Sequence, residues 1–407
     1  MFKIALRNVF RNRRRTLLSL TVIALGSAAL FVAKGYFDHI NYKMKLGAVE
    51  QYGHLQIASP LLWERSSEGY EHLISKEELA KIEGILNGEK EVEAYTTQLS
   101  FSGLIGTEKK SSAFIALGIE PGSAVGGAGF GSFDELITEG ENLAPTDKST
   151  ILLGVGLAKN LKVQLGEYVN VLSTSTAGAI SAGSLKIIGL IETGQPEVDL
   201  RIAVTPLFFA QRILQTEGVE KVIVKLKSLE ATDSVLARLQ RRFDEAGLAL
   251  KIKTWSDLAV FYHQVRGWFG QIYRFMTVAI FVLVFFSILE VMTMSFFERM
   301  REIGTIRAIG TKRVQVFQLF LFEGLLIGFI GGLLGAALGW GFGFLVNEAG
   351  IRYIPPSLSV EVPLKIRLVP INLVAPFLTA VLSTLISALY PALKAARFII
   401  VEALRHV

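Results

Sequence analysis

Four long apolar stretches constrain this chain more than any other feature. They cover residues 16–33, 275–297, 314–346 and 368–393, and the only charged residues within them are Glu290 and Glu323. A helix that crosses a lipid bilayer needs about 20 mostly apolar residues. The sequence therefore predicts a membrane protein with four transmembrane helices, at residues 16–37, 271–297, 314–346 and 368–393.

Two other interpretations of these stretches are weaker. The first stretch could be a cleaved signal peptide, but it is longer than the usual apolar core and no convincing small-residue cleavage site follows it. The stretches could also be buried helices of a large soluble protein. Four of them in one chain make that alternative unlikely on length alone.

The distribution of basic residues predicts the orientation. Lys and Arg are concentrated in residues 1–15, 298–313 and 394–407, and the first of these segments contains no acid. Because basic loops stay in the cytoplasm, both termini and the middle loop are expected there. Residues 38–268 and a short loop at 347–367 are then outside. Residues 1–15 are expected to form an amphipathic helix on the inner leaflet, or merely a charged flank that blocks translocation.

The large segment at 38–268 is long enough for its own hydrophobic core, and its patterns predict an α+β domain. Residues 94–105 and 111–119 read as a hairpin, and residues 53–57 as a strand. A β–α–β run at 219–254 has Asp233 as the expected N-cap of its helix. A glycine-rich segment at 122–131 is expected to be a loop.

Composition and motifs exclude several classes of function. A mean hydropathy of +0.45 is incompatible with disorder, and the absence of Cys excludes thiol catalysis and cysteine-ligated metals. The surplus of 42 Lys and Arg over 36 Asp and Glu is small and unevenly spread, whereas a nucleic-acid binder carries a basic face on a folded domain, so we expect no nucleic-acid partner. No phosphate-binding loop or metal-binding His motif occurs. We therefore expect no catalytic residues, no metal and no cofactor bound by this chain, although an active site assembled only in the folded outer domain remains an alternative.

The segment at 298–313 is the most informative in the chain. Met300, Ile303 and Ile306 recur at helical spacing, Gly304 and Gly310 flank Arg307, and the next apolar stretch follows directly. A short helix with an apolar ridge and charged flanks suits docking into a groove of a partner protein. An ordinary basic inner loop would have a similar composition, so the pattern alone leaves both possibilities open.

Residues 298–310, Glu-Arg-Met-Arg-Glu-Ile-Gly-Thr-Ile-Arg-Ala-Ile-Gly, resemble the E-R-x-R-E-I-G-x-x-R-A-x-G signature of the MacB/LolC/LolE/FtsX-like permeases. These are the mechanotransmitting (type VII) subunits of ABC transporters. Residues 5–12, 154–167 and 390–405 also resemble segments of that family. The chain departs from the pattern at Glu290, where a neutral polar residue is usual, and at Phe398-Ile399-Ile400, which replaces polar residues and a proline.

The resemblance implies a dimeric permease in the bacterial inner membrane that pairs with a cytoplasmic ABC ATPase dimer. That partner would use ATP and Mg²⁺, and a second permease copy or a paralogue would complete the membrane part. Because the chain starts directly at its first span, it looks most like the lipoprotein-releasing LolC/LolE type. Lipid, a lipoprotein substrate or a periplasmic partner are the other molecules implied. The residues that the resemblance assigns to ATPase coupling are Glu298, Arg299, Arg301, Glu302, Ile303, Gly304, Arg307, Ala308 and Gly310.

Other functions stay open at this point. The chain could be an FtsX-like signalling subunit that activates an external hydrolase, although that type has a smaller outer domain, or a MacB-like exporter of small molecules or peptides. A membrane-anchored enzyme is a third alternative. Glu290 and Glu323 could line a proton path or have a structural role at the bundle or dimer, because a carboxyl group in hydrocarbon needs a partner, water or a proton.

Overall fold

The computed structural model describes residues 2–11, 13–63, 70–122, 136–354 and 361–398. Most of the predicted glycine-rich loop at 122–131, and the tail beyond residue 398, lie outside this range. The chain divides into two compact units. One contains Met1–Tyr42, Gln264–Tyr353 and Pro363–Val407, and the other contains Lys43–His263 and Ile354–Val362.

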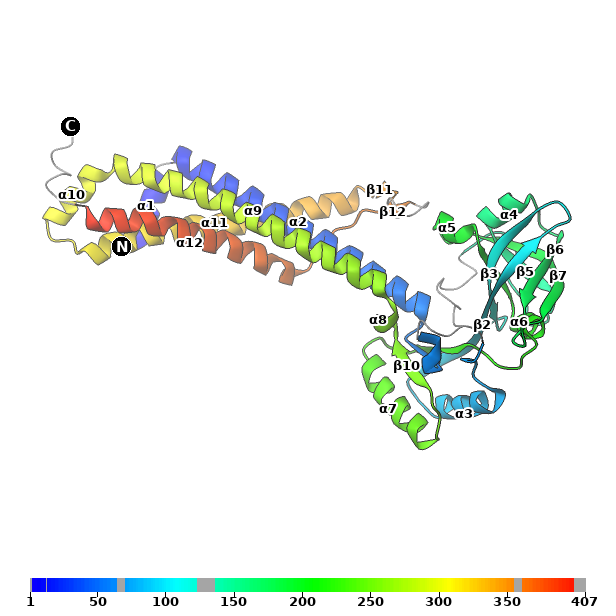
Figure 1. Ribbon diagram of the computed structural model, residues 1–407. Helices are drawn as coiled ribbons and strands as arrows, with labels where there is room; N and C mark the ends of the chain where they lie inside the picture. Colours follow the sequence, from blue (N-terminus) through cyan, green and yellow to red (C-terminus); the bar gives the residue numbers. More distant parts are fainter. Residues whose placement is uncertain (1, 12, 64–69, 123–135, 355–360, 399–407) are drawn as a thin grey trace. The chain divides into compact units, whose positions relative to one another are not determined.

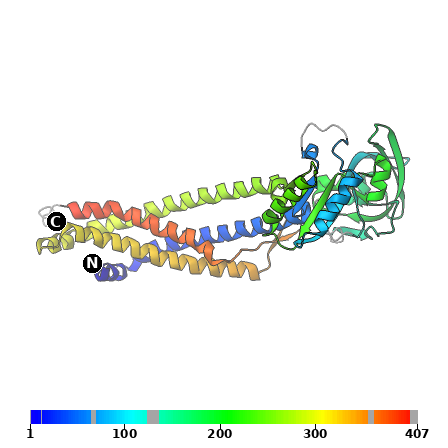
Figure 2. The same ribbon diagram turned by 90° about the horizontal axis from the view of Figure 1, so that it is seen from below.

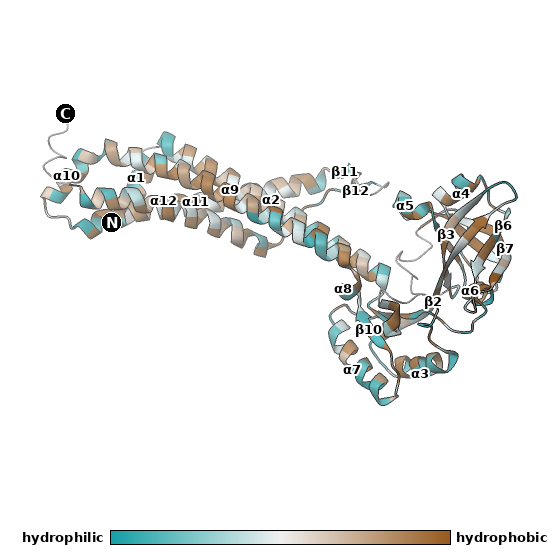
Figure 3. Ribbon diagram, in the orientation of Figure 1, coloured by the Kyte–Doolittle hydropathy of each residue, from teal (hydrophilic) through white to brown (hydrophobic). Residues whose placement is uncertain are grey.

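The first unit is a helical bundle (Figures 1 and 2). Among the described residues, four of its helices are long and apolar enough to cross a membrane. The hydropathy colouring of Figure 3 shows apolar residues along most of their length. Its elements are α1 (Phe2–Arg11), α2 (Arg13–Tyr52), α9 (Val260–Glu298), α10 (Met300–Ala308), α11 (Arg313–Glu348), β11 (Arg352–Tyr353), β12 (Val362–Pro363), η3 (Pro370–Leu373) and α12 (Val374–Arg397).

Several element boundaries differ from the expectation. Helix α1 covers Phe2–Arg11, the arginines at 13–15 belong to α2, and α12 begins at Val374 after η3 rather than at residue 368. Both α2 and α9 extend well past their apolar stretches, to Tyr52 and from Val260, and so leave the bundle as continuous helices. Hydropathy marks the segment that suits a lipid environment, but a helix continues as long as its backbone hydrogen bonds do.

Close helix contacts depend on glycine in α11, which is the most buried of the four long helices. A Cβ on Gly328 would lie 2.0 Å from Thr384 Oγ1 of α12, and one on Gly335 would lie 2.6 Å from Ser27 Cβ of α2. Small residues let helix backbones approach closely in a membrane, where no hydrophobic effect drives them together. The polar side chains at this contact are satisfied locally, since Ser383 and Thr384 donate to carbonyl oxygens of their own helix.

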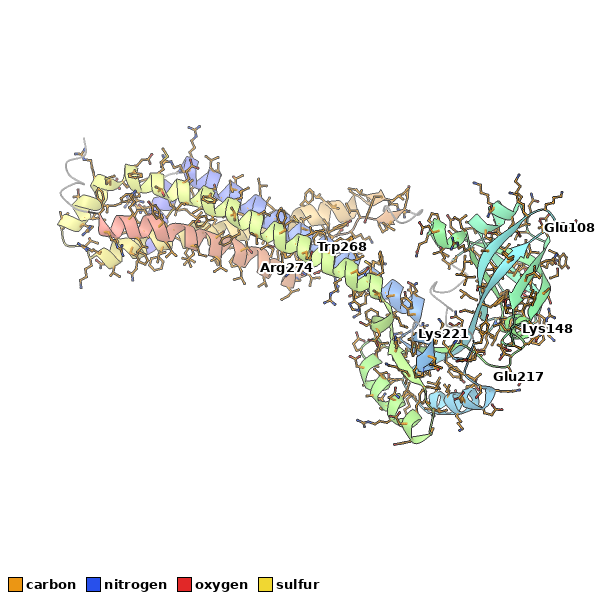
Figure 4. All side chains as sticks on the ribbon, viewed as in Figure 1. Glu108, Lys148, Glu217, Lys221, Trp268 and Arg274 are labelled. Atoms are coloured by element: carbon orange, nitrogen blue, oxygen red, sulfur yellow. The ribbon has the colours of Figure 1, made fainter. Side chains whose placement is uncertain are left out.

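Charged and aromatic side chains cluster toward the end of the bundle away from α10. Lys34 pairs with Asp38 at 2.9 Å and lies over the ring of Tyr273. Trp268 and Arg274, labelled in Figure 4, lie on the same part of α9. Aromatic and basic residues of this kind are typical of a membrane–water interface.

The second unit is α+β, as predicted. Its strands are β1 (Leu55–Ala58), β2 (Val92–Gly106), β3 (Ser111–Ile119), β4 (Ile137–Gly140), β5 (Thr150–Gly154), β6 (Tyr168–Thr174), β7 (Ile180–Ile191), β8 (Ile202–Pro206), β9 (Lys221–Leu226) and β10 (Lys251–Thr254). Its helices are η1 (Pro60–Trp63), α3 (Lys76–Asn87), α4 (Val155–Leu161), α5 (Pro196–Asp199), α6 (Leu207–Leu214), α7 (Thr232–Glu245) and α8 (Trp255–Leu258).

Six strands close on themselves in this unit. The order β2-β3-β8-β5-β7 is completed by β6, which pairs with both β7 and β2. One large cluster, which includes Phe101, Phe114 and Phe209, fills the space between these strands and helices α4 and α6. Closure removes free strand edges, which are otherwise sites of aggregation.

The sheet also continues on the other side, from the first half of β2. Strands β9, β1 and β10 continue the sheet, and α3 and α7 cover it with a separate core that includes Ile82, Leu239 and Phe243. The predicted hairpin is confirmed as β2 and β3, and the predicted β–α–β run as β9, α7 and β10 with β1 between the strands. The prediction for Asp233 is wrong, since Ala231 is the N-cap and Asp233 lies in the first turn, where its charge still favours the helix dipole.

Candidate functional site

The segment predicted to contact a partner lies at the end of the bundle where α1 and the last turn of α12 also lie (Figures 1 and 2). Helix α9 ends at Glu298, and Arg299 interrupts it with φ −101° and ψ 13°. Helix α10 then runs to Ala308. Gly310 adopts φ +108°, which favours glycine, and the amide of Lys312 donates to Gln315 Oε1 at the start of α11.

Helix α10 has two faces. Met300, Ile303 and Gly304 are buried, and the first two belong to a core cluster with Phe296 and Phe320. Ile306 and Ile309 face outward, and the side chain of Ile309 is 82 % exposed. The predicted apolar ridge therefore has two parts. Met300 and Ile303 pack into the bundle, whereas Ile306 is exposed, next to the exposed Ile309.

A buried polar cluster lies directly beneath α10. The guanidinium of Arg299 donates to Glu323 Oε1 at 2.9 Å, and the side-chain amide of Asn8 donates to the same oxygen at 2.6 Å. All three residues are buried. Because an unpaired charge in the interior is costly, this cluster ties α1, the α9–α10 junction and α11 to one another. We call Asn8, Arg299 and Glu323 the junction cluster.

Ion pairs surround the junction cluster on the exposed side. Arg15 of α2 donates to Glu298 through two nitrogens, and Arg11 of α1 donates to both oxygens of Glu302 at 3.0 Å. Exposed pairs of this kind are worth about 0–1 kcal/mol each. They add little stability; one pair joins α2 to the end of α9, and the other joins α1 to α10. Arg307 donates to the backbone oxygen of Phe398 after α12.

The residues predicted for coupling thus separate into groups. Glu298, Glu302 and Arg307 are engaged at the rim, whereas Ile303 and Gly304 are internal. Arg301, Ala308 and Gly310 are exposed. Arg299 differs from Arg301, because its guanidinium is turned inward to Glu323 and the residue is only 8 % exposed.

The two intramembrane acids have different surroundings. Glu323 is inside the bundle in the junction cluster, whereas Glu290 is exposed on the outer face of α9. No sequence pattern indicated that Arg11 and Arg15 pair with Glu302 and Glu298, or that Asn8 bonds Glu323. Asn8 and Arg11 belong to the family-like segment at residues 5–12, but no local pattern links them to partners 315 and 291 positions away.

Two models of known protein families match this chain. Residues 16–242 match the MacB-like periplasmic core domain, and residues 274–398 match the FtsX-like permease C-terminal model. The first model covers α2 from residue 16 and most of the second unit, and the second covers α9 from residue 274 and continues past the end of α12.

Individual relatives agree with these models. The chain is 25 % identical over 282 residues to the lipoprotein-releasing system transmembrane protein LolC of Neisseria meningitidis, covering 65 % of this chain and 67 % of the relative. It is 24 % identical over 349 residues to the macrolide export ATP-binding/permease protein MacB of Bdellovibrio bacteriovorus, covering 82 % of this chain and 50 % of that one. The chain thus spans about two thirds of the length of one relative and half of the other. Among solved structures, the periplasmic region of MacB from Actinobacillus actinomycetemcomitans is 15 % identical with a TM-score of 0.36, covering 53 % of this chain and 95 % of that one.

A periplasmic core domain inserted behind the first of four apolar helices defines a membrane protein of the ABC-transporter permease class. The chain belongs to the MacB/LolC/FtsX-like permease family.

Proposed function

We propose that this permease is the membrane subunit of an ATP-driven complex and that α10 is its coupling helix, which receives motion from a separate cytoplasmic ATPase. The single observation that carries the proposal is the two-faced character of α10. Its inner face is fixed in the bundle through Met300 and Ile303, and its outer face presents Arg301, Ile306 and Ile309 without a contact that would cover them. An exposed apolar residue flanked by charge is typical of a docking surface.

The junction cluster supports a route for the motion. A displacement of α10 moves Arg299. Because Glu323 Oε1 accepts hydrogen bonds from both Arg299 and Asn8, α11 and α1 must follow or the buried charges lose their partners. The continuous helices α2 and α9 then carry the movement along the bundle. Packed cores shift between discrete arrangements rather than deforming gradually.

The substrate in this proposal is a lipoprotein or another hydrophobic molecule, in line with the relatives whose name describes lipoprotein release. Relatives named for macrolide export support efflux as the alternative. The chain itself would be non-catalytic, with ATP and Mg²⁺ used by the partner. The complex would sit in the bacterial inner membrane with both termini and α10 in the cytoplasm. Co-purified lipid-modified protein would support transport, and a stably bound external hydrolase would support FtsX-like signalling.

The test reverses charge at the proposed docking surface. Arg301→Glu should abolish stimulation of the co-purified ATPase in lipid nanodiscs, and Gly304→Trp should do the same by displacing α10 from the bundle. Arg352→Glu is the matched control, because Arg352 is an exposed arginine beyond the far end of α11. Unchanged stimulation with both α10 variants, each inserted normally, would reject the coupling-helix assignment.

A further inference from the structure

A small polar cavity lies beside the junction cluster, inside the helical bundle. Its volume is about 30 Å³, and residues of α1, α2, α9 and α11 line it. By the same measure, one water molecule needs about 10–15 Å³. The cavity therefore has room for one or two water molecules. The polar side chains that line it include those of Asn8, Ser19, Arg299 and Glu323.

The hydroxyl group of Ser19 indicates that this cavity holds a ligand. Ser19 is only 1 % exposed, and its Oγ has no hydrogen-bond partner among the described residues. Other hydroxyl groups of the same helix are satisfied, since Thr16 donates to the Val9 carbonyl and Thr21 to the Leu17 carbonyl. Most buried polar side-chain atoms have a partner in the protein or in ordered water. The partner that Ser19 lacks within the described chain must come from the cavity that it lines.

The junction cluster leaves two further polar groups available at this cavity. Both hydrogen bonds that the described residues make to the Glu323 carboxylate end on Oε1, which leaves Oε2 as an acceptor. The Nε of Arg299 is buried and has no hydrogen-bond partner in the part of the chain that the structure describes. It lies 3.6 Å from Glu302 Oε2, which is too far for a hydrogen bond. A donor, an acceptor and a hydroxyl group thus border one small cavity.

The charges around the cavity favour a neutral ligand. Arg299 and Glu323 carry opposite charges and pair with each other, and Arg15, which also lines the cavity, pairs with Glu298. A cation would face the guanidinium of Arg299, and an anion would face the carboxylate of Glu323. Water is neutral, fits the volume and both donates and accepts hydrogen bonds. Buried waters typically make about three hydrogen bonds, which matches the three groups that need a partner.

We propose that this cavity binds an ordered water molecule that bridges Ser19 to the junction cluster. The water accepts a hydrogen bond from Arg299 Nε, donates one to Glu323 Oε2 and forms a third with Ser19 Oγ. It thereby adds α2 to the helices that the junction cluster joins. The water site does not depend on coupling to an ATPase, so its test needs no partner protein.

The first test uses X-ray radiolysis of the full-length chain in lipid nanodiscs. Radiolysis of a bound water produces a hydroxyl radical beside the side chains that it touches, and methionine is readily oxidised to its sulfoxide. Met292 lines the cavity and is 2 % exposed, whereas Met300 belongs to the same core cluster, does not line the cavity and is 8 % exposed. Radicals from bulk solvent would favour Met300. Faster oxidation of Met292 than of Met300 is therefore the result expected from a bound water.

A variant that fills the cavity provides the control for this measurement. Ser19→Val places methyl groups where the water would bind. It should lower the rate of Met292 oxidation several-fold, to that of Met300 or below, and leave Met300 unchanged. Oxidation of Met292 that is no faster than that of Met300 in the wild type, or that Ser19→Val does not slow, would overturn the proposal.

A second, milder variant keeps the proposal testable if Ser19→Val fails to fold. With the water bound, Ser19→Ala removes a satisfied hydrogen bond, so Tm in detergent should fall. Without it, the same change removes an unsatisfied buried hydroxyl, and Tm should stay the same or rise. Ser383→Ala is the matched control, because that buried hydroxyl donates to the Ala380 carbonyl of its own helix and lines no part of this cavity. A Tm of Ser19→Ala at or above the wild-type value would contradict the bound water.

Discussion

At the scale of single residues, the structure gives different roles to charges that look alike in the sequence. Arg299 and Arg301 are two positions apart in one motif, yet Arg299 is buried against Glu323 and Arg301 is exposed. The break in the helix at Arg299 turns its side chain toward the bundle. The proposed coupling role of Arg299 therefore does not require that it touch the partner.

The contribution of the junction cluster to protein stability can be measured separately from its proposed contribution to coupling. Glu323→Leu leaves the Arg299 charge buried and unpaired, which should cost about 3–5 kcal/mol. The double variant Arg299→Met/Glu323→Leu should regain most of that stability, because apolar residues of similar size often replace a buried pair without loss. Thermal unfolding in detergent measures the first effect. A double variant that also regains full ATPase stimulation would show that the cluster is structural only.

His54 should make the second unit sensitive to acid. Its imidazole is buried, and Nδ1 accepts a hydrogen bond from the Leu226 amide at 3.2 Å. Burial, with a smaller contribution from the Lys225 charge, lowers the pKa of His54 below its usual value. As pH falls below about 6.5 the unfolded chain binds the proton first, so stability should decrease with falling pH through the window down to the folded pKa.

The check compares Tm of the wild type and His54→Gln between pH 8 and pH 5. The variant should be less stable at pH 8, yet should lose less of its Tm on acidification. Parallel decreases in both proteins would assign the acid sensitivity to another group.

At the scale of elements, the close packing of α11 against its neighbours depends on glycines, which have no side chain. Gly328→Val should separate α11 from α12, because its Cβ would overlap Thr384, and overpacking of this kind costs about 1–3 kcal/mol or more. Gly341→Val is the matched control, since nothing lies within 4 Å of a Cβ built there. Thermal unfolding of both variants in detergent gives the comparison. Equal losses would mean that helix propensity, rather than the close contact, sets the effect.

At the scale of the whole molecule, the predicted orientation can be measured directly. Ile309 after α10 and Ile180 in β7 are each 82 % exposed, and the chain has no native cysteine. In intact cells a membrane-impermeant maleimide should label Ile180→Cys and not Ile309→Cys, with both labelled after lysis. Equal exposure makes the side of the membrane the only difference, and the reverse labelling would overturn the cytoplasmic assignment of α10.

Much of the architecture could be predicted from the sequence, because its signals are local. Length and hydropathy suffice to mark the apolar helices, and alternation suffices to mark the β2–β3 hairpin and the β9–α7–β10 run. The closure of six strands could not be predicted, since β6 reaches β2 across more than 60 residues of chain. No local sequence pattern encodes which strand edges pair.

The sequence by itself determined that the chain crosses a membrane, that an α+β domain interrupts its helices, and that residues 298–310 carry a family signature. Only the tertiary structure decided which charged side chains are buried and which partners they contact. Glu290 and Glu323 each stand alone in an apolar stretch, but the rotation of α11 puts Glu323 against Arg299 and Asn8, while the rotation of α9 leaves Glu290 outside. The reason is that hydropathy is a property of a segment, whereas the face a helix turns inward is set by how its neighbours pack.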